Sequence, residues 1–463
     1  MATLEFHGAT SQVTGSCHLL RTARGNILLE CGLFQGGDVN ERQNRDPFPF
    51  AIEDIDVVVL SHAHIDHSGR LPLLVQRGYR GEVFTHRATA ELCDIMLQDS
   101  AYIHEKDAEW INRRISRGNG PPVEPLYTRD DARAVQSLFE LLDYQQRMEI
   151  LPGVEICLYD AGHILGSAIV ELTVAENGTS RRLVFSGDLG HKGAPILRDP
   201  HTLRSADLVL MESTYGDRLH RPWSSTWDEL GKILTNARAA RGNILIPAFA
   251  VGRTQELLYL LSKNYDAWGI GNWQIFLDSP MAIHATNIYQ QNEDIFDKQA
   301  GILQQETGTL FNLDNLHLTD TTEQSMAINQ ISSGAIIIAG SGMCTGGRIR
   351  HHLRNNIERR QSHVVIVGFQ AFGTTGRALV DGATRIRLMG REYDVRAQIH
   401  TIGGLSAHAD QQGLIDWYSG FIDRPPVALV HGEPRAMDAL SERLTSELHA
   451  EVIRGRKGHK IEL

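Results

Sequence analysis

The sequence lacks any apolar run long enough to span a bilayer, and its first residues lack the basic region and apolar core of a signal peptide. We therefore expect a cytoplasmic protein with no membrane partner. Cysteine is also scarce, because the 463 residues include only five, scattered along the chain and never in a CxxC pair. This pattern argues against a disulfide framework and indicates free buried thiols in a reducing compartment.

Positive charge is in short supply as well. The formal net charge of −11 argues against broad, sequence-independent attraction to nucleic acid. It does not exclude a local basic groove, and two bound divalent ions would offset part of the negative charge. Histidine, in contrast, is abundant at 21 residues, and this excess fits metal chemistry.

The length of 463 residues is too great for one compact core and predicts two or three domains. Short β patterns with glycine turns fill the chain to about residue 51 and indicate a β meander. Helical spacing covers residues 87–116 and 130–142, with a Gly-Pro-rich loop at 118–122.

Strands and helices alternate from about residue 208, and this rhythm predicts a mostly parallel sheet covered by helices. After about residue 394 the chain returns to short strands. We find no internal repeat and no long linker. The middle block is therefore expected to be inserted into the first domain.

One stretch carries the clearest chemistry. An apolar, β-branched run at residues 57–60 predicts a buried strand, and His62, His64, Asp66 and His67 follow it directly. Side chains on an extended strand tip repeat every two residues, so His62 and His64 lie on the same side. Such nitrogen and oxygen donors at the end of a rigid strand can hold two metal ions side by side.

Three later stretches place a potential ligand beside glycine or at the end of a strand. His163 lies between Gly162 and Gly166, Asp188 follows the strand that ends at residue 186, and His431 follows an apolar run. A lone histidine of this kind is more often a core or surface residue. We assign these residues to the metal site because they accompany the HxHxDH cluster.

The set His62-x-His64-x-Asp66-His67, His163 and Asp188 resembles the metallo-β-lactamase superfamily of di-metal hydrolases. Later stretches are similar to motifs of its β-CASP nuclease branch, in the expected order and over nearly the whole chain. Residues 211–216 are similar to motif A, 405–410 to motif B and 430–433 to motif C, and the stretches 247–257 and 340–348 are similar to further segments of that branch.

This resemblance implies a metallo-β-lactamase αββα sandwich, residues 1–208 and 392–463, with an inserted α/β β-CASP domain at 209–391. It also implies two Zn²⁺ per chain. One would be held by His62, His64 and His163 and the other by Asp66, His67 and His431, with Asp188 bridging the two. His408 would be the proton donor and Glu212 the carboxylate that orients it, so Asp66, Glu212 and His408 form the catalytic set.

One position departs from the family, because Glu30 stands where an aspartate usually supports the metal loop. A glutamate is longer, and its supporting role is left open. The glycine loop at 340–347 precedes a helix and has no GK[ST], so it is not a nucleotide-triphosphate P-loop. We interpret it as a phosphate-binding turn, with a tight packing turn as the alternative. The candidate substrate-binding residues are Arg253, Ser279, Gly342, Gly346 and Arg348.

The function implied is a zinc-dependent ribonuclease that cuts single-stranded RNA, mainly as an endonuclease, with 5′–3′ exonuclease activity left open. A DNA nuclease and a small-molecule ester or lactam hydrolase are the alternatives from the same superfamily, and a non-catalytic RNA-binding scaffold is a further one. The scaffold is disfavoured because every ligand position is filled. The oligomeric state, including a homodimer, stays open.

Overall fold

The computed structural model describes residues 2–115, 121–176, 178–311 and 313–463. These residues form two compact units. Unit 1 comprises Met1–Lys192, Asp199–Leu219 and His408–Leu463, and unit 2 comprises Gly193–Arg198 and His220–Ala407. Within the described residues, no helix is long and apolar enough to cross a membrane.

The first sheet of unit 1 has the strand order β22-β1-β2-β3-β4-β5-β6. Its first three strands pair antiparallel, which confirms the predicted β meander, and β3 to β6 then run parallel. The strands are β1 (Thr3–Phe6), β2 (His18–Thr22), β3 (Gly25–Leu29), β4 (Val57–Val59), β5 (Glu82–His86), β6 (Phe139–Leu142) and β22 (Lys460–Glu462).

The second sheet of unit 1 has the strand order β21-β20-β11-β10-β9-β8-β7. Its strands β7 to β10 pair antiparallel, whereas β11, β20 and β21 add to it in parallel. The strands are β7 (Arg147–Leu151), β8 (Val154–Asp160), β9 (Ala168–Glu176), β10 (Thr179–Phe185), β11 (Leu208–Glu212), β20 (Val427–Val430) and β21 (Val452–Arg454).

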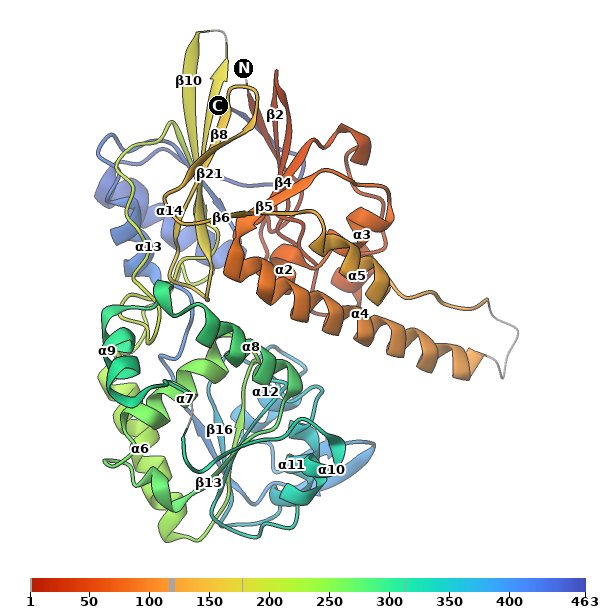
Figure 1. Cartoon of the computed structure of the whole chain (residues 1–463), viewed down its shortest axis with the longest axis vertical. Helices are drawn as coiled ribbons and strands as arrows, with labels where there is room; N and C mark the ends of the chain where they lie inside the picture. Colours follow the sequence, from red (N-terminus) through yellow and green to blue (C-terminus); the bar gives the residue numbers. More distant parts are fainter. Residues whose placement is uncertain (1, 116–120, 177, 312) are drawn as a thin grey trace. The chain divides into compact units, whose positions relative to one another are not determined.

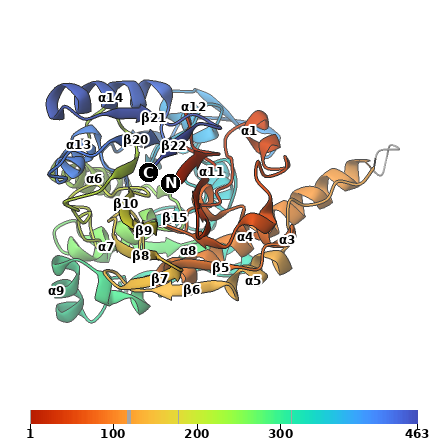
Figure 2. The ribbon, with the colours of Figure 1, turned by 90° about the horizontal axis from the view of Figure 1, so that it is seen from above.

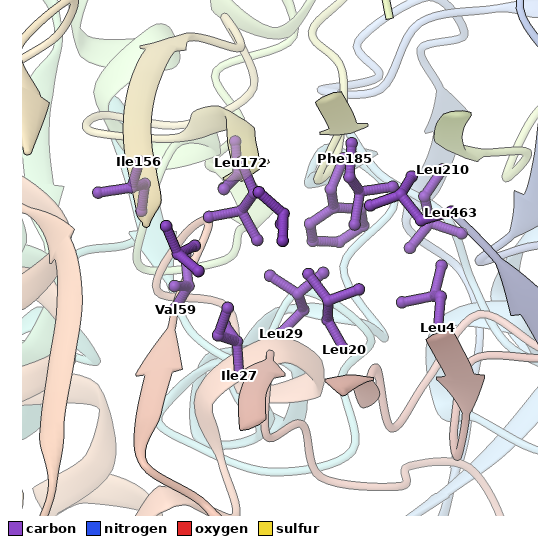
Figure 3. Close-up of a cluster of buried hydrophobic side chains, with 14 of the residues drawn as sticks. Leu4, Leu20, Ile27, Leu29, Val59, Ile156, Leu172, Phe185, Leu210 and Leu463 are labelled. Carbon is purple, nitrogen blue, oxygen red and sulfur yellow. The ribbon is translucent and has the colours of Figure 1, made fainter. Parts of the chain in front are cut away.

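The two sheets pack face to face through apolar side chains (Figure 3). Leu20, Leu29 and Val59 of the first sheet meet Leu172 and Phe185 of the second, and all five are at most 2% exposed. Each such side chain stabilises the fold by about 1.5–3 kcal/mol. The sheet ends that carry the candidate ligands are therefore held rigidly.

Helices cover the outer faces of both sheets. The long helix α4 (Arg87–Ile115) contacts β5 and β6 and is the orange helix of Figure 1. Helix α14 (Pro434–Leu448) covers β20 and β21 and packs beside α13 (Gln411–Tyr418), as Figure 2 shows. Unit 1 is thus an αββα sandwich, as predicted. Its other helices are α1 (Asp38–Gln43), α2 (Ile65–Ser68), α3 (Leu71–Gln76) and α5 (Arg129–Gln136).

The helix predicted over residues 130–142 is wrong in its second half. Helix α5 starts from a capping box between Thr128 and Asp131 and ends at Gln136. Residues 139–142 form β6 instead, because they pair with β5 in the register Val83↔Phe139 to His86↔Leu142. Tertiary pairing overrides local helix propensity here. The predicted loop at 118–122 and Ser116 lie largely outside the described residues.

Unit 2 is built on a parallel sheet with the strand order β14-β13-β15-β12-β16-β19. Apolar side chains of α11 and α12 cover one face of it. A hairpin of β17 (Arg385–Leu388) and β18 (Arg391–Asp394) is attached. The sheet strands are β12 (Ile244–Pro247), β13 (Gln274–Leu277), β14 (Leu316–Leu318), β15 (Ala335–Ala339), β16 (His363–Ile366) and β19 (Gln398–Thr401). The helices are α6 (Trp223–Ala239), α7 (Arg253–Lys263), α8 (Pro280–Gln291), α9 (Lys298–Thr307), α10 (Thr322–Ile328), α11 (Ile349–Asn356) and α12 (Thr375–Val380).

The chain passes between the two units four times, after Lys192, Arg198, Leu219 and Ala407, whereas the sequence predicts domain boundaries at 208/209 and 391/392. The structure divides the chain after Leu219 and again after Ala407, and it adds residues 193–198 to unit 2. Strand β11 pairs with β10 and β20, so it belongs to the sandwich. Strand β19 pairs with β16 and so extends the sheet of unit 2.

Candidate metal centre

The HxHxDH stretch lies at the carboxyl end of β4, whose three valines are all buried. The chain leaves the strand as an extended segment and turns into α2, the single helical turn that contains Asp66 and His67. Backbone hydrogen bonds fix this turn, since Asp66 O accepts from Ser16 N and His67 O accepts from Cys31 N, both at 2.8 Å. The donors therefore belong to a loop anchored on neighbouring segments.

Three histidines and one aspartate form a first group of converging donor atoms. His64 Nδ1 lies 3.1 Å from both His62 Nε2 and His163 Nε2. Asp188 Oδ2 lies 3.5 Å from His62 Nε2 and 3.5 Å from His163 Nε2. Zinc–nitrogen bonds of about 2.0–2.1 Å in a tetrahedron place neighbouring donors about 3.3 Å apart, which these separations match.

A second group contains Asp66, His67 and His431. His431 Nε2 lies 3.1 Å from His67 Nε2 and 3.4 Å from Asp66 Oδ2. His67 Nε2 also lies 3.3 Å from Asp188 Oδ2. That carboxylate oxygen is thus shared by both groups. The structure brings together all seven residues that the sequence singled out as ligands.

The electrostatics of this cluster fit a pair of cations. Burial raises the pKa of Asp188, but the surrounding histidines hold it well below its usual range. Asp188 Oδ1 accepts no hydrogen bond from any described residue. Burial lowers the pKa of His62 well below its usual value and that of His64 to about 4, so both are neutral, the form that binds metal. The carboxylate of Asp188 beside the neutral imidazoles of His62 and His64 suits a divalent ion. Burial opposes a charge on His67, but the carboxylates of Asp188, Glu30 and Asp66 raise its pKa well above the usual value.

Glu30, the residue that departs from the family, supports His67. Its carboxylate faces His67 Nδ1 and accepts hydrogen bonds from Ser61 N (2.6 Å) and Ser61 Oγ (3.1 Å). The side chain of Glu30 is fully buried, and its φ of 67° lies in the left-handed region. A carboxylate on the far nitrogen of a ligating histidine orients the ring.

Two further supports were missed at the sequence level. Ser61 Oγ lies 3.0 Å from His62 Nδ1, and Thr214 Oγ1 lies 3.0 Å from His431 Nδ1. Ser61 directly precedes the HxHxDH cluster and Thr214 lies within motif A, but a hydroxyl has no spacing signature of its own. They fix the rings that carry two of the ligand atoms.

His408 and Glu212, the predicted proton donor and its orienting carboxylate, lie beside the two groups of donor atoms. His408 pairs with Gly190 as an isolated β-bridge, and Ala409 N donates to Leu189 O at 2.7 Å, which places His408 beside Asp188. His408 Nδ1 lies 3.3 Å from the carboxylate of Glu212. Burial opposes a charge on His408, but Glu212 and Asp188 raise its pKa to about 9.

The five candidate substrate-binding residues lie in unit 2, in segments that follow β12, β13 and β15. Arg253 is bound by Glu256 and the carbonyl of Leu405. Arg348 donates to Asp278 Oδ1 (2.8 Å), Thr319 O (2.8 Å) and Asp320 O (2.6 Å). Both guanidinium groups are therefore held by protein acceptors within unit 2.

The other three candidates lie in turns at strand ends. Ser279 caps α8, since its Oγ accepts from Ala282 N. Gly346 N donates to Ser341 Oγ at 3.0 Å, and Gly342 O accepts from Gln370 Nε2 at 2.9 Å. The glycine loop is therefore a closed turn held by hydrogen bonds within the loop and by one from Gln370.

Comparisons with known proteins agree with this architecture. Three family models match the chain: a metallo-β-lactamase superfamily domain at residues 19–214, a Beta-Casp domain at 254–379 and a Zn-dependent metallo-hydrolase RNA specificity domain at 392–454. The chain is also similar to a crystal structure of a protein of unknown function from Enterococcus faecalis, with a TM-score of 0.56 and 13% identity over 100% of both chains. That likeness concerns the fold alone.

Two curated relatives span most of the chain. Ribonuclease TTHA0252 of Thermus thermophilus is 38% identical over 94% of this chain and 94% of its own length. The transcription termination factor FttA of Methanocaldococcus jannaschii is 29% identical over 93% of this chain and 67% of its own length. With the paired ligand groups and the motif residues in place, the chain belongs to the β-CASP branch of the metallo-β-lactamase superfamily of metal-dependent hydrolases.

Proposed function

We propose that this protein is a zinc-dependent ribonuclease that cuts single-stranded RNA. The observation that carries the proposal is Asp188 Oδ2, which lies within 3.5 Å of His62 and His163 and 3.3 Å from His67. One carboxylate oxygen is thus shared by two sets of ligands, the arrangement that a phosphodiester-cleaving pair of metal ions needs. The relative named as a ribonuclease and the RNA specificity model support RNA as the substrate.

In this proposal two Zn²⁺ are held per chain. His62, His64 and His163 would hold one, Asp66, His67 and His431 would hold the other, and Asp188 would serve both. Two divalent ions at such a site activate water at neutral pH and offset the charge of a phosphodiester. Glu30 and Ser61 keep His67 and His62 oriented for this purpose.

His408 moves the proton. Its Nδ1 faces Glu212, which fixes the ring, and the charges of Glu212 and Asp188 raise the pKa of His408. A protonated imidazole beside the ligands can donate to the leaving 3′-oxygen. Addition of water across the P–O bond then leaves a 5′-phosphate and a 3′-hydroxyl, mainly at internal positions of the strand.

The proposal extends to unit 2, whose residues Arg253, Ser279, Gly342, Gly346 and Arg348 would contact or shape the RNA path. It also places the enzyme in the cytoplasm. Size-exclusion chromatography with light scattering separates a monomer from the homodimer that the sequence leaves open.

The test is cleavage of end-labelled single-stranded RNA and of DNA of the same sequence, with zinc content measured in parallel. We expect internal cuts in RNA by the wild type, and none by His67→Ala or by a chelator-treated sample. The matched control is His284→Ala, which removes an exposed histidine in unit 2 and should cut as the wild type does. Bound zinc without cleavage of RNA would contradict the proposal, and cleavage of DNA alone would reassign the substrate.

A further inference from the structure

The exposed phenylalanines of this chain are gathered at one place. Of the phenylalanines in the described residues, Phe249, Phe369 and Phe372 are the exposed ones, at 44%, 60% and 94%. All three follow strands of the unit 2 sheet, because Phe249 comes after β12 and the other two come after β16. An exposed phenyl ring gains little from folding and invites aggregation, so a cluster of them indicates a binding surface.

The sheet topology identifies the same place independently. Strands β12 and β15 are neighbours, and the chain leaves them in opposite directions: β12 leads to β13 on one side, and β15 leads to β16 on the other. In open parallel sheets, ligands bind outside the carboxyl ends of the strands at such a switch point. The loops that follow these two strands carry Phe249 and Gly342.

The ring of Phe249 lies directly on glycine backbone at this switch point. A Cβ added to Gly342 would lie 2.9 Å from the ring, and one added to Gly368 would lie 3.6 Å from it. Only glycine at 342 lets the phenyl ring approach so closely. The backbone of Phe249 is itself fixed, since Phe249 O accepts from Thr254 Oγ1 at 2.7 Å.

The loop that carries the other two rings is tied to the glycine loop. Gln370 is 5% exposed, and its Nε2 donates to Gly342 O at 2.9 Å and to Gly368 O at 3.1 Å. Gly376 N donates to Met343 O at 3.1 Å. Phe369 flanks Gln370 directly. The loop that carries Phe369 and Phe372 is therefore hydrogen-bonded to the glycine loop, and the ring of Phe249 lies against Gly342 of the glycine loop.

We propose that Phe249, Phe369 and Phe372 form a platform on which unpaired bases of a single-stranded RNA stack. This inference rests on the proposed ribonuclease function and adds how unit 2 holds the strand. The rings are aromatic rather than aliphatic, and within the described residues none of the three makes a ring–ring or cation–π contact with the protein. Every base offers a π face, so such stacking tolerates any sequence and needs no broad positive surface. That property suits a chain with a net charge of −11.

The experiment compares rings with aliphatic side chains in the intact zinc enzyme. The variants are Phe372→Leu, Phe372→Trp and the triple replacement of Phe249, Phe369 and Phe372 by leucine. The substrate is an end-labelled RNA of about 12 nucleotides, a length that spans a typical single-strand site. A base-free strand of equal length serves as a competitive inhibitor. It keeps only the sugar-phosphate chain, so it reports binding that does not involve base stacking.

We expect Phe372→Leu to raise the KM for RNA about 5-fold or more at unchanged kcat, and the triple variant to raise it about 100-fold. Phe372→Trp should keep the wild-type KM, because indole also stacks. The inhibition constant of the base-free strand should not change in any variant. The matched control is Trp110→Leu, which removes an aromatic side chain that is 57% exposed on α4 and should leave KM unchanged.

Any of three results would overturn the platform. The first is a wild-type KM in the triple variant, the second is an equal weakening of inhibition by the base-free strand, and the third is an equal rise in KM in Trp110→Leu. Hydrolysis of bis(p-nitrophenyl) phosphate reports the metal centre separately and should be the same in every variant. If the wild type does not cut RNA, the proposed function has failed. Equilibrium binding of the same RNA then still tests whether the three rings form a platform. Wild-type affinity in the triple variant would refute the platform. An affinity that is lost in the triple variant but kept in Phe372→Trp would support it.

Discussion

Two buried aspartates, one in each unit, follow strand ends but differ in how their oxygens are satisfied. Asp278 in unit 2 accepts hydrogen bonds from Thr319, Arg348, Ser325 and His352, at 2.6–2.8 Å. Asp188 in unit 1 has histidine nitrogens around it at 3.3–3.8 Å, and its Oδ1 accepts no hydrogen bond from a described residue. Residues of the fold satisfy the hydrogen-bonding capacity of Asp278. Asp188 instead needs a bound ligand among the histidine nitrogens that surround it.

This difference separates structural polar clusters from functional ones. Fully paired buried polar groups fix a fold, whereas donors that converge without satisfying each other indicate a ligand. The causes of the lowered pKa values of Asp278 and Asp188 reflect the same difference. Burial raises the pKa of Asp278, but hydrogen bonds from His352, Ser325 and Thr319 lower it to about 2. In Asp188, the charges of neighbouring histidines take the place of those hydrogen bonds.

The largest effect should come from Asp188→Asn. An amide cannot share one anionic oxygen between two cations, so zinc content and RNA cleavage should both fall, cleavage by about 10³-fold or more. Zinc analysis and a cleavage assay measure this, and circular dichroism should show an intact fold. If this variant bound two zinc ions and kept full activity, Asp188 would not have the bridging role that we assign to it.

Asp278→Asn should act on stability instead. It replaces an acceptor of four hydrogen bonds and leaves the Arg348 guanidinium without its anion, at a cost of about 3 kcal/mol in the free energy of unfolding. Denaturant unfolding measures the loss, and zinc content per folded chain should stay at the wild-type value. If this variant instead lost zinc at unchanged stability, the contrast between the two aspartates would be refuted.

Glu30→Gln should weaken the zinc held by His67 about 10- to 100-fold. The amide contacts His67 Nδ1 without the charge that keeps the ring oriented and basic. Competition with a zinc chelator gives the affinity. Glu30→Asp, which restores the usual family residue, serves as the control and should bind more weakly than wild type, because its carboxylate is one methylene further from His67 Nδ1. Equal affinity in all three proteins would show that Glu30 does not support the metal loop.

The smallest effect concerns acid stability. The pKa of Asp278 is lower in the folded protein, about 2, than the ordinary 3.8, so its contribution is complete above about pH 4 and is lost as the pH falls through 2. The stability difference between wild type and Asp278→Asn should therefore shrink by about 1–2 kcal/mol between pH 4 and pH 2. Unfolding curves at both pH values measure it. A difference that stays constant or widens would contradict the assigned cause.

Much of unit 1 could be predicted from the sequence because its signals are local. The strand that ends in His62-x-His64-x-Asp66-His67 places its ligands by strand period and one turn, and the antiparallel strands before it show their glycine turns. His163, Asp188 and His431 come from distant segments. They could be assigned through the family motifs, whereas spacing alone would have left them as ordinary strand-end residues.

What could not be predicted depends on tertiary partners. The strand at 139–142 is recognisable only once β5 is beside it. The acceptors of the Arg348 guanidinium, Asp278 and Thr319, lie far from it in the sequence, so these hydrogen bonds could not be predicted. The three phenylalanines gave no signal, because their exposure at one sheet edge exists only in the folded chain.

The most direct test of the account is a zinc titration of metal-free protein, with cleavage of end-labelled single-stranded RNA followed at each step. The geometry around Asp188 predicts that cleavage is negligible with one zinc per chain and reaches its full rate as the second binds. Full activity at one zinc per chain, or two tightly bound zinc ions without RNA cleavage, would contradict the di-zinc ribonuclease.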